Sequence, residues 1–510
     1  MNIQISMKNK MMTLAICSLW AFIILFFVSP DSYTHDMYYR WDSAWFFTGG
    51  KAWVEGLRPY IDFADSKGPV LWLIHAVAYI LSPYNYLGLF WLSVLLYGVI
   101  FYIDYKIADL FLHNSRLSWL VVMFLPWVYF NPWYHFEISA EDWCQPVISL
   151  VIYRMVKLLY AKENSKRELC MTGFVLGFAL MWTLFIKFSL TVMIGVTECY
   201  CLYYLIRERM NIVKPLLFFS LGVLSLAAPI LAYMLYTGIL EAFVTEYFVH
   251  TLQTVSSDNP LGDYIHEWFR TFADAYYTPL FTLCVIGCYL LGRKIEKDRY
   301  FLVIAFLGFY SLAIRHNIHR HYVNCCLFFL LPFLIYMIQT HQEKLLSAYQ
   351  RTKRLTIAVV LFLTILVNWT YTEGFIVPNL FFVNQQDRTD YYTVAYYMSQ
   401  VPKPTLLYYR FAERGYGTLA GAIPAAKYWS TQSDPTQEML DSQHRDALTG
   451  KADFVITYMT PEYDKLFTGI GYHRVYEFTD LALYSKHQLK APSQPIRVSN
   501  LDVLLKRKPF

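Results

Sequence analysis

The sequence predicts an all-α polytopic membrane bundle of about eleven transmembrane helices with periplasmic juxtamembrane helices, followed by a small C-terminal α/β soluble domain. The first reason is composition: 56% of the 510 residues are hydrophobic and 16% are charged, whereas about 25% is usual in soluble domains. The second is that long apolar runs recur through residues 1–370. The third is that residues 371–510 turn polar, with short β-rich runs.

The long apolar runs are expected to cross the bilayer, because about 17 to 25 apolar residues span its hydrocarbon core. Lys8 and Lys10 precede the first run, and no small-residue cleavage site follows it, so we expect an uncleaved span. The expected spans are residues 12–28, 87–105, 117–130, 144–160, 171–186, 190–206, 215–236, 280–291, 300–314, 322–338 and 355–369.

Basic residues predict the orientation, since Lys and Arg near span ends stay on the cytoplasmic side. With a cytoplasmic N-terminus, the basic clusters near residues 106–116, 154–167, 207–214, 293–299 and 344–354 all face the cytoplasm. This holds only if the apolar run 69–81 does not cross, and about 13 residues is too short to do so. The protein is therefore expected to be a multi-pass protein of the inner (plasma) membrane, with its C-terminal domain periplasmic or extracellular.

The net charge of +5 is small for this length and comes from clusters between apolar runs. It therefore indicates topology rather than a nucleic-acid partner. The nine cysteines lie in or beside apolar runs, which is typical of small buried hydrophobic residues and implies no disulfide framework.

The C-terminal region is expected to alternate strands and helices in a small α/β domain. The expected strands are residues 405–409, 453–458, 473–478 and 481–484, and the expected helices are 389–399 and 436–449. The predicted domains are thus residues 1–370, including the first outer loop at 31–86, and residues 371–510.

The first outer loop is unusually polar and aromatic for a segment so close to hydrocarbon, which makes it a candidate site. Residues 43–55 are expected to form a helix that ends at Gly56. Its aromatic face, with Trp45, Phe46 and Trp53, is expected to lie toward the membrane as an interfacial anchor.

Three stretches of this loop carry a resemblance: Asp42-Ser43, the run from Gly56 to Asp62 (GLRPYID), and Asp65-Ser66-Lys67-Gly68-Pro69. They resemble the first periplasmic loop of the GT-C superfamily, in the branch that contains dolichyl-phosphate-mannose protein mannosyltransferases and the aminoarabinose transferase of lipid A. Ser43 stands where relatives have a second acid, and Gly68 stands where they have a first proline. Weaker similarities are the acidic loop with Glu141 and Asp142, and Arg320-His321-Tyr322 at the start of a late span.

The resemblance implies transfer of a sugar from a polyprenyl-phosphate donor to a protein, lipid or glycan acceptor on the outer face, with inversion at the anomeric carbon. It implies Asp42 as general base, and an N-cap of the following helix is the alternative role. Lys67 is expected to meet the donor phosphate. Glu141 and Asp142 are expected to complete the catalytic set by orienting the base or the acceptor. Further expected substrate contacts are Arg40, Arg58, Arg315, Arg320, His321 and Tyr322.

A divalent metal is possible but not required, because five outer histidines are scattered without ligand spacing. No metal-ligand set is therefore assigned. The alternatives for function are a transporter or flippase of lipid-linked glycans, and a polymerase or ligase that uses the same lipid-linked donor. Membrane lipids are expected partners in every case.

Overall fold

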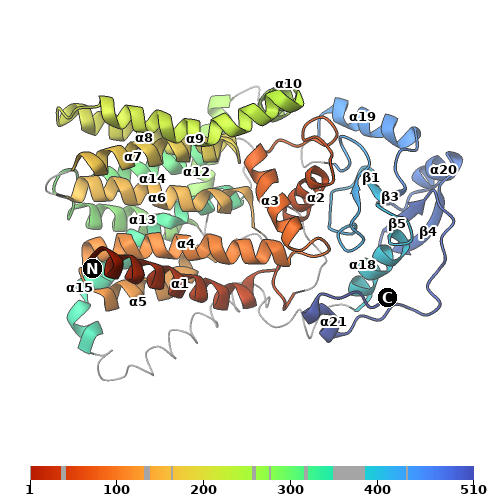
Figure 1. Ribbon diagram of the computed structural model, residues 1–510, viewed down its shortest axis with the longest axis horizontal. Helices are drawn as coiled ribbons and strands as arrows, with labels where there is room; N and C mark the ends of the chain where they lie inside the picture. The colour runs from red at the N-terminus through yellow and green to blue at the C-terminus, as the bar shows by residue number, and fades with distance from the viewer. Residues whose placement is uncertain are drawn as a thin grey trace. The chain divides into compact units, whose positions relative to one another are not determined.

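The computed structural model describes residues 2–35, 42–130, 138–161, 165–254, 260–274, 277–314, 320–347, 385–431 and 435–510 (Figure 1). The chain divides into two compact units. The helical unit comprises Met1–Val28, Ser93–Leu231 and Ser257–Gly374. The mixed unit comprises Ser29–Leu92, Ala232–Ser256 and Phe375–Phe510.

The long helices contain the apolar runs of the sequence, and several extend beyond them by a turn or more. They are α1 (Asn2–Val28), α4 (Leu87–Leu112), α5 (Ser115–Tyr129), α6 (Ala140–Tyr160), α7 (Lys166–Leu184), α8 (Phe188–Arg207), α9 (Val213–Thr237), α12 (Pro260–Phe272), α13 (Tyr277–Gly292), α14 (Phe301–Ala313), the 3-10 helix η2 (Arg320–Phe329) and α15 (Leu330–Thr340). In the described part of the chain, each predicted span overlaps one of these helices, except that the span 322–338 is divided between η2 and α15. The predicted span 355–369 lies outside the described residues.

Five described helices are long and apolar enough to cross a bilayer: α4, α7, α8, α9 and the part of α1 from Asn9 to Val28. Their packing is that of membrane helices, in which small residues let backbones approach closely. A Cβ on Gly177 of α7 would lie 2.1 Å from the Phe219 carbonyl of α9, and a Cβ on Gly222 of α9 would lie 2.1 Å from the Phe174 carbonyl of α7. Glycine is therefore required at both positions of this contact.

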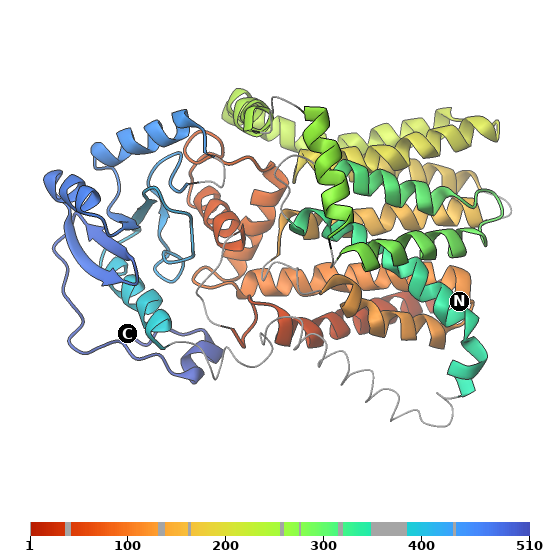
Figure 2. The same cartoon turned by 180° about the vertical axis from the view of Figure 1, so that it is seen from behind.

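In the described part of the chain, four of the connections with basic clusters lie at one end of the helical unit. Those between α4 and α5, α6 and α7, α8 and α9, and α13 and α14 share the end at which α1 begins, as both views show (Figures 1 and 2). Two contacts agree with this: Phe111 packs on Tyr160 with ring centroids 5.2 Å apart, and Arg207 lies 3.2 Å from Asp298. The basic clusters that alternate along the sequence are therefore gathered at the same end of the helical unit.

The mixed unit begins with two short helices, α2 (Asp42–Val54) and α3 (Pro69–Leu81). Gly56 has φ +97 just after α2, a conformation that glycine adopts without strain. The predicted helix at 43–55 and its end are therefore confirmed. α3 has 13 residues, too few to cross a bilayer, and covers the run 69–81.

The aromatic face of α2 packs on other parts of the mixed unit, where the sequence predicts that it lies toward the membrane. Phe46 is buried, packing on Trp72 of α3 with ring centroids 6.1 Å apart. Trp45 lies 4.9 Å from the Trp429 ring, and Trp53 donates a hydrogen bond to the Tyr233 hydroxyl at 2.6 Å. Protein thus covers this face in part, since Trp45 and Trp53 are half-buried, and a local aromatic pattern cannot distinguish contact with protein from contact with lipid.

The mixed unit also contains a short segment from the middle of the chain. This segment forms α10 (Leu240–Phe243), the π-helical turn η1 (Val244–Val249) and α11 (His250–Thr254). The C-terminal region then forms a sheet in the order β2-β1-β3-β5-β4. The strands are β1 (Thr405–Tyr408), β2 (Ile423–Pro424), β3 (Phe454–Tyr458), β4 (His473–Phe478) and β5 (Leu481–Ser485). The helices are α18 (Gln385–Met398), α19 (Gln437–Leu448), α20 (Pro461–Gly469) and α21 (Asn500–Leu505). The predicted α/β character is confirmed.

Pairing in the sheet is mixed. β1 is parallel to β2 and β3, with Leu407 opposite Val455, and β5 is antiparallel to β3 and β4. Leu407, Val455, Phe467 and Tyr484 belong to one buried cluster beneath the sheet. β2, α20 and α21 were not predicted. For β2 the reason is that two residues of strand leave no periodic signal.

The first outer loop and the C-terminal region are parts of this one unit and bond to each other directly. The Tyr86 and Thr418 hydroxyls are 2.9 Å apart, and the Lys403 ammonium donates to Glu55 at 3.2 Å. The Ala64 amide donates to the Lys427 carbonyl at 3.0 Å. The predicted domain boundary at 370/371 lies outside the described residues.

Candidate functional site

The candidate base Asp42 is the first residue of α2 and is half-buried. A carboxylate there is favoured by the partial positive charge of the helix N-terminus. The next residue, Ser43, is fully buried. Arg40, the substrate contact predicted just before it, lies outside the described residues.

The candidate phosphate contact Lys67 lies in the turn that leads into α3. Its ammonium donates to Ser66 Oγ at 3.2 Å, lies 4.0 Å from Asp65 Oδ1 and sits 5.7 Å from the centre of the Phe46 ring. Its carbonyl accepts from the buried Tyr60 hydroxyl at 2.8 Å. The backbone of the turn is thus fixed, while 20% of the Lys67 side chain stays exposed. A cation held in this way suits an anionic headgroup.

Arg58 is engaged within its own turn. Its Nε and Nη2 donate to Asp62 at 3.1 and 3.2 Å, and its amide donates to Asp62 Oδ2 at 2.8 Å. Partial burial would raise the pKa of the Asp62 carboxyl, but the Arg58 hydrogen bonds outweigh it and hold the pKa below its ordinary value. The predicted role of Arg58 in substrate contact stays a prediction.

Lys51 of α2 is a buried lysine that the sequence pattern did not single out as a site residue. Burial lowers its pKa to about 8, against the opposing influence of the Glu413 and Glu55 carboxylates. Burial likewise raises the pKa of Glu413, which accepts from the Gly415 amide at 2.7 Å. The Lys51 ammonium of α2 and the Glu413 carboxylate of the C-terminal region therefore attract each other electrostatically.

Glu246 of η1 is the centre of a second buried polar group in the mixed unit. Its carboxylate accepts from Lys427 at 2.5 Å and from the Tyr428 hydroxyl at 3.1 Å, and His250 Nδ1 lies 3.1 Å away. Tyr428 also packs in one small cluster with Ala64, beside the motif that carries Asp65 and Lys67. No motif marks Glu246 in the sequence, and only the fold joins it to residues 427–428.

In the helical unit the structure assembles a buried charged cluster from three distant segments. Glu141 lies in the first turn of α6 and forms an ion pair with Lys187, the residue before α8. Both side chains are at least nine-tenths buried. The Lys187 ammonium also lies 3.6 Å from the centre of the Tyr322 ring in η2, a close cation–π contact. Glu141 and Tyr322 were predicted site residues, and Lys187 had no assigned role.

Asp142, the neighbour of Glu141, has a different environment. Its Oδ2 accepts from the Ser139 amide and hydroxyl, both at 2.8 Å, and its Oδ1 accepts from the Tyr97 hydroxyl at 3.0 Å. This is the capping box at the start of α6. Both oxygens have structural partners, which favours a positioning role.

The remaining predicted residues are less informative. Arg315 lies outside the described residues, and Arg320 and His321 are described only as backbone at the start of η2. Within the described part of the chain, no group of three or more His, Cys, Asp or Glu side chains is placed to hold a metal ion.

Comparison with known proteins gives one kind of match. No protein-family model and no curated protein sequence matches the chain. Among solved structures, it is similar to ArnT from Cupriavidus metallidurans bound to undecaprenyl phosphate, with TM-score 0.59, 11% identity, and coverage of 93% of this chain and 98% of that one. The apo state of the same ArnT gives TM-score 0.60 and 11% identity, and covers 94% and 98%.

ArnT is a lipid A aminoarabinose transferase with the GT-C fold. The chain therefore has the polytopic membrane fold of ArnT over nearly its full length, which confirms the fold class.

Proposed function

We propose that this protein is a glycosyltransferase that moves a sugar from a polyprenyl-phosphate donor to an acceptor on the outer face of the membrane. One observation carries the proposal: a chain with the full-length fold of ArnT has the loop motif of the same superfamily, with Lys67 at the turn into α3. The neighbouring ArnT binds undecaprenyl phosphate, which supports a polyprenyl-phosphate donor here.

The reaction is a displacement at the anomeric carbon. A bond forms between the acceptor oxygen and this carbon while the bond to the phosphate oxygen breaks. The electron pair leaves with the polyprenyl phosphate, and the acceptor proton goes to a base. Asp42 is the base in this proposal, because Glu141 is held in an ion pair and Asp142 in a capping box.

Lys67 meets the negative charge that gathers on the departing phosphate. Its fixed backbone and partly exposed ammonium support this role. Glu141 positions Lys187 against Tyr322, and Asp142 holds the start of α6. In this proposal these four residues support the helical unit without exchanging protons with the substrate.

The proposed topology has a cytoplasmic N-terminus and an exported C-terminal region in the inner (plasma) membrane. The gathering of basic connections at the end where α1 begins supports it. Reporter fusions after Ser165 and after Phe510 should lie on opposite sides of the membrane, and the same side for both would refute this topology.

The direct test of function is release of free polyprenyl phosphate. The purified chain, given an undecaprenyl-phosphate-linked sugar and an acceptor extract, should cleave the sugar-phosphate bond and label the acceptor with a single sugar. A flippase would move the donor intact, and a polymerase or ligase would transfer a longer glycan; either result would overturn the proposal.

A matched pair of variants ties this activity to the loop. Lys67→Ala should reduce transfer strongly, whereas Lys465→Ala should leave it unchanged, since Lys465 is an exposed lysine of α20. Equal effects of both substitutions would remove Lys67 from the site.

A further inference from the structure

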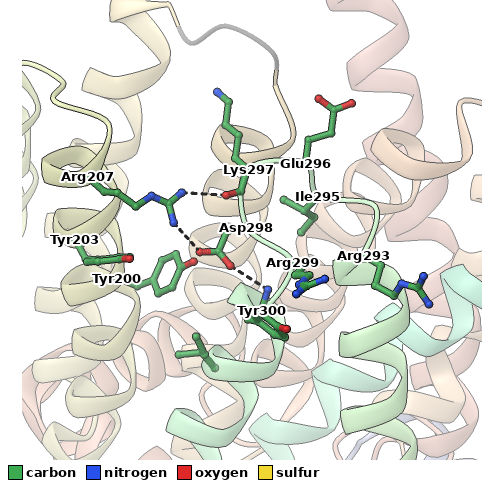
Figure 3. A pocket seen from close by; sticks show the side chains of 11 residues that line it. Tyr200, Tyr203, Arg207, Arg293, Ile295, Glu296, Lys297, Asp298, Arg299 and Tyr300 are labelled. Atoms are coloured by element: carbon green, nitrogen blue, oxygen red, sulfur yellow. Dashed lines mark hydrogen bonds and ion pairs between the residues drawn. The ribbon is translucent and has the colours of Figure 1, made fainter.

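A pocket of about 750 Å³ opens at the end of the helical unit where the basic connections gather (Figure 3). It lies between the last turns of α8 and the connection 293–300 that joins α13 to α14. None of the residues assigned to the transferase site lines it. Its chemistry therefore needs a separate explanation.

The wall of the pocket is held by a built polar contact. Arg207 donates to Asp298 Oδ2 at 3.2 Å and to the Lys297 carbonyl at 3.0 Å. The Tyr300 amide donates to the other Asp298 oxygen at 3.0 Å, as the dashed lines show. Because one carboxylate joins α8 to the start of α14, the connection 293–300 has a defined path.

The lining carries more positive than negative charge. Asp298 neutralises Arg207, which leaves Arg293, Lys297 and Arg299 against Glu296. The Arg293 and Arg299 guanidinium groups lie across the pocket from Arg207 (Figure 3), and both side chains are exposed. The Arg299 guanidinium stacks on the Tyr300 ring at 4.8 Å. Guanidinium groups bind phosphate through paired N–H donors.

Directly beside these charges the lining becomes apolar and exposed. Ile304 of α14 and Tyr203 of α8 line the pocket, and they are 44% and 54% exposed. Ile206 and Leu307 continue the exposed apolar surface on the same two helices. A ligand that fits here has an anionic head and a long apolar tail, since a free anion makes no use of the apolar part.

We propose that this pocket binds the phosphate headgroup of an anionic glycerophospholipid, with its acyl chains along α8 and α14. Arg293 and Arg299 contact the phosphate, and Arg207 and Asp298 hold the connection in place. The inference stands on the pocket alone and does not depend on the transferase proposal.

The test measures lipid binding to the full purified chain by native mass spectrometry, with phosphatidylglycerol and phosphatidylcholine as probes. The wild type should retain phosphatidylglycerol in preference to phosphatidylcholine. The double variant Arg293→Gln/Arg299→Gln should weaken that binding about 25-fold, at about fivefold for each charge near the membrane surface. The matched control Lys166→Gln/Arg167→Gln removes two exposed charges from the start of α7 and should change this binding less than twofold.

Each other outcome would overturn the proposal. Equal losses in both double variants would mean that only general surface charge attracts the lipid. Full competition by inorganic phosphate would identify a simple anion site. A loss of undecaprenyl phosphate retention in Arg293→Gln/Arg299→Gln as large as the loss of phosphatidylglycerol would assign the pocket to a polyprenyl lipid. Circular dichroism on both double variants checks that they are folded.

Discussion

The first outer loop and the Glu141–Lys187–Tyr322 cluster place their charged residues in opposite ways. The loop carries Asp42, Arg58 and Lys67 within one short stretch of sequence, and the Lys67 ammonium remains partly exposed. The cluster brings together residues from α6, the turn before α8, and η2, and it buries its charges. In our proposal the loop meets the substrate, and the cluster supports the helical unit.

The difference teaches how to assign roles to acidic residues that look alike in sequence. Glu141 and Asp142 are adjacent, yet one balances a buried lysine and the other caps a helix. A buried charge with a specific partner is costly to disturb, whereas a cap contributes about 1 kcal/mol. The predictions below use these magnitudes.

The largest effect on stability is expected from Lys187→Met. It leaves the Glu141 carboxylate buried without its cation, which should cost about 3–5 kcal/mol in the free energy of unfolding. Chemical unfolding in detergent measures it. The double variant Glu141→Gln/Lys187→Met should recover most of the loss, because no buried charge remains; a double variant as unstable as the single one would show that the pair is not the reason.

Trp429→Ala tests whether the loop depends on the C-terminal region. Trp429 is buried against Trp45 and Phe63, so its loss should cost about 3 kcal/mol and speed hydrogen exchange in α2. Leu501→Ala, at an exposed position of α21, should change stability by less than about 0.5 kcal/mol. Unchanged exchange in α2 after Trp429→Ala would mean that the loop holds its shape alone.

Asp142→Asn separates the two acidic neighbours. It weakens the capping box and should cost about 1 kcal/mol, whereas Glu141→Gln should cost several-fold more, because it leaves the Lys187 charge buried without its counterion. Both variants are compared by thermal unfolding in the same detergent. Equal losses would contradict the separate roles.

An effect of similar size to that of Asp142→Asn is expected beside the sheet, at Asp453, just before β3, and it depends on pH. Despite partial burial, hydrogen bonds from His487 and Thr405 hold the pKa of the Asp453 carboxyl below its ordinary value. A carboxyl with a lowered folded pKa stabilises above its unfolded pKa, near 4, and this stabilisation is lost as pH falls through the folded pKa.

Asp453→Asn should therefore cost about 1 kcal/mol at pH 7 and progressively less below about pH 4. Hydrogen exchange of the β1 and β3 amides across this range measures it. A cost that is the same at pH 3 and pH 7 would show that the ionised carboxylate is not the stabilising form.

The sequence predicted most of the fold, because apolar runs and alternating strands are local signals. It also predicted the helix over 69–81, whose length alone separates it from a span. The contacts made by Trp45 and Trp53 could not be predicted, since lipid and protein cover an aromatic face equally well. Lys187 and Glu246 were missed for a related reason: their partners are distant in the chain, and no local pattern links them.

The central claim is that Asp42 is the base of a lipid-linked sugar transferase, and one pair of measurements on purified Asp42→Asn tests it directly. Transfer from an undecaprenyl-phosphate-linked sugar and binding of the same donor are measured in parallel with the wild type. A base acts mainly in the transition state, so transfer should fall by about 100-fold or more while donor affinity changes by less than about threefold. Near-normal transfer by Asp42→Asn would contradict the account.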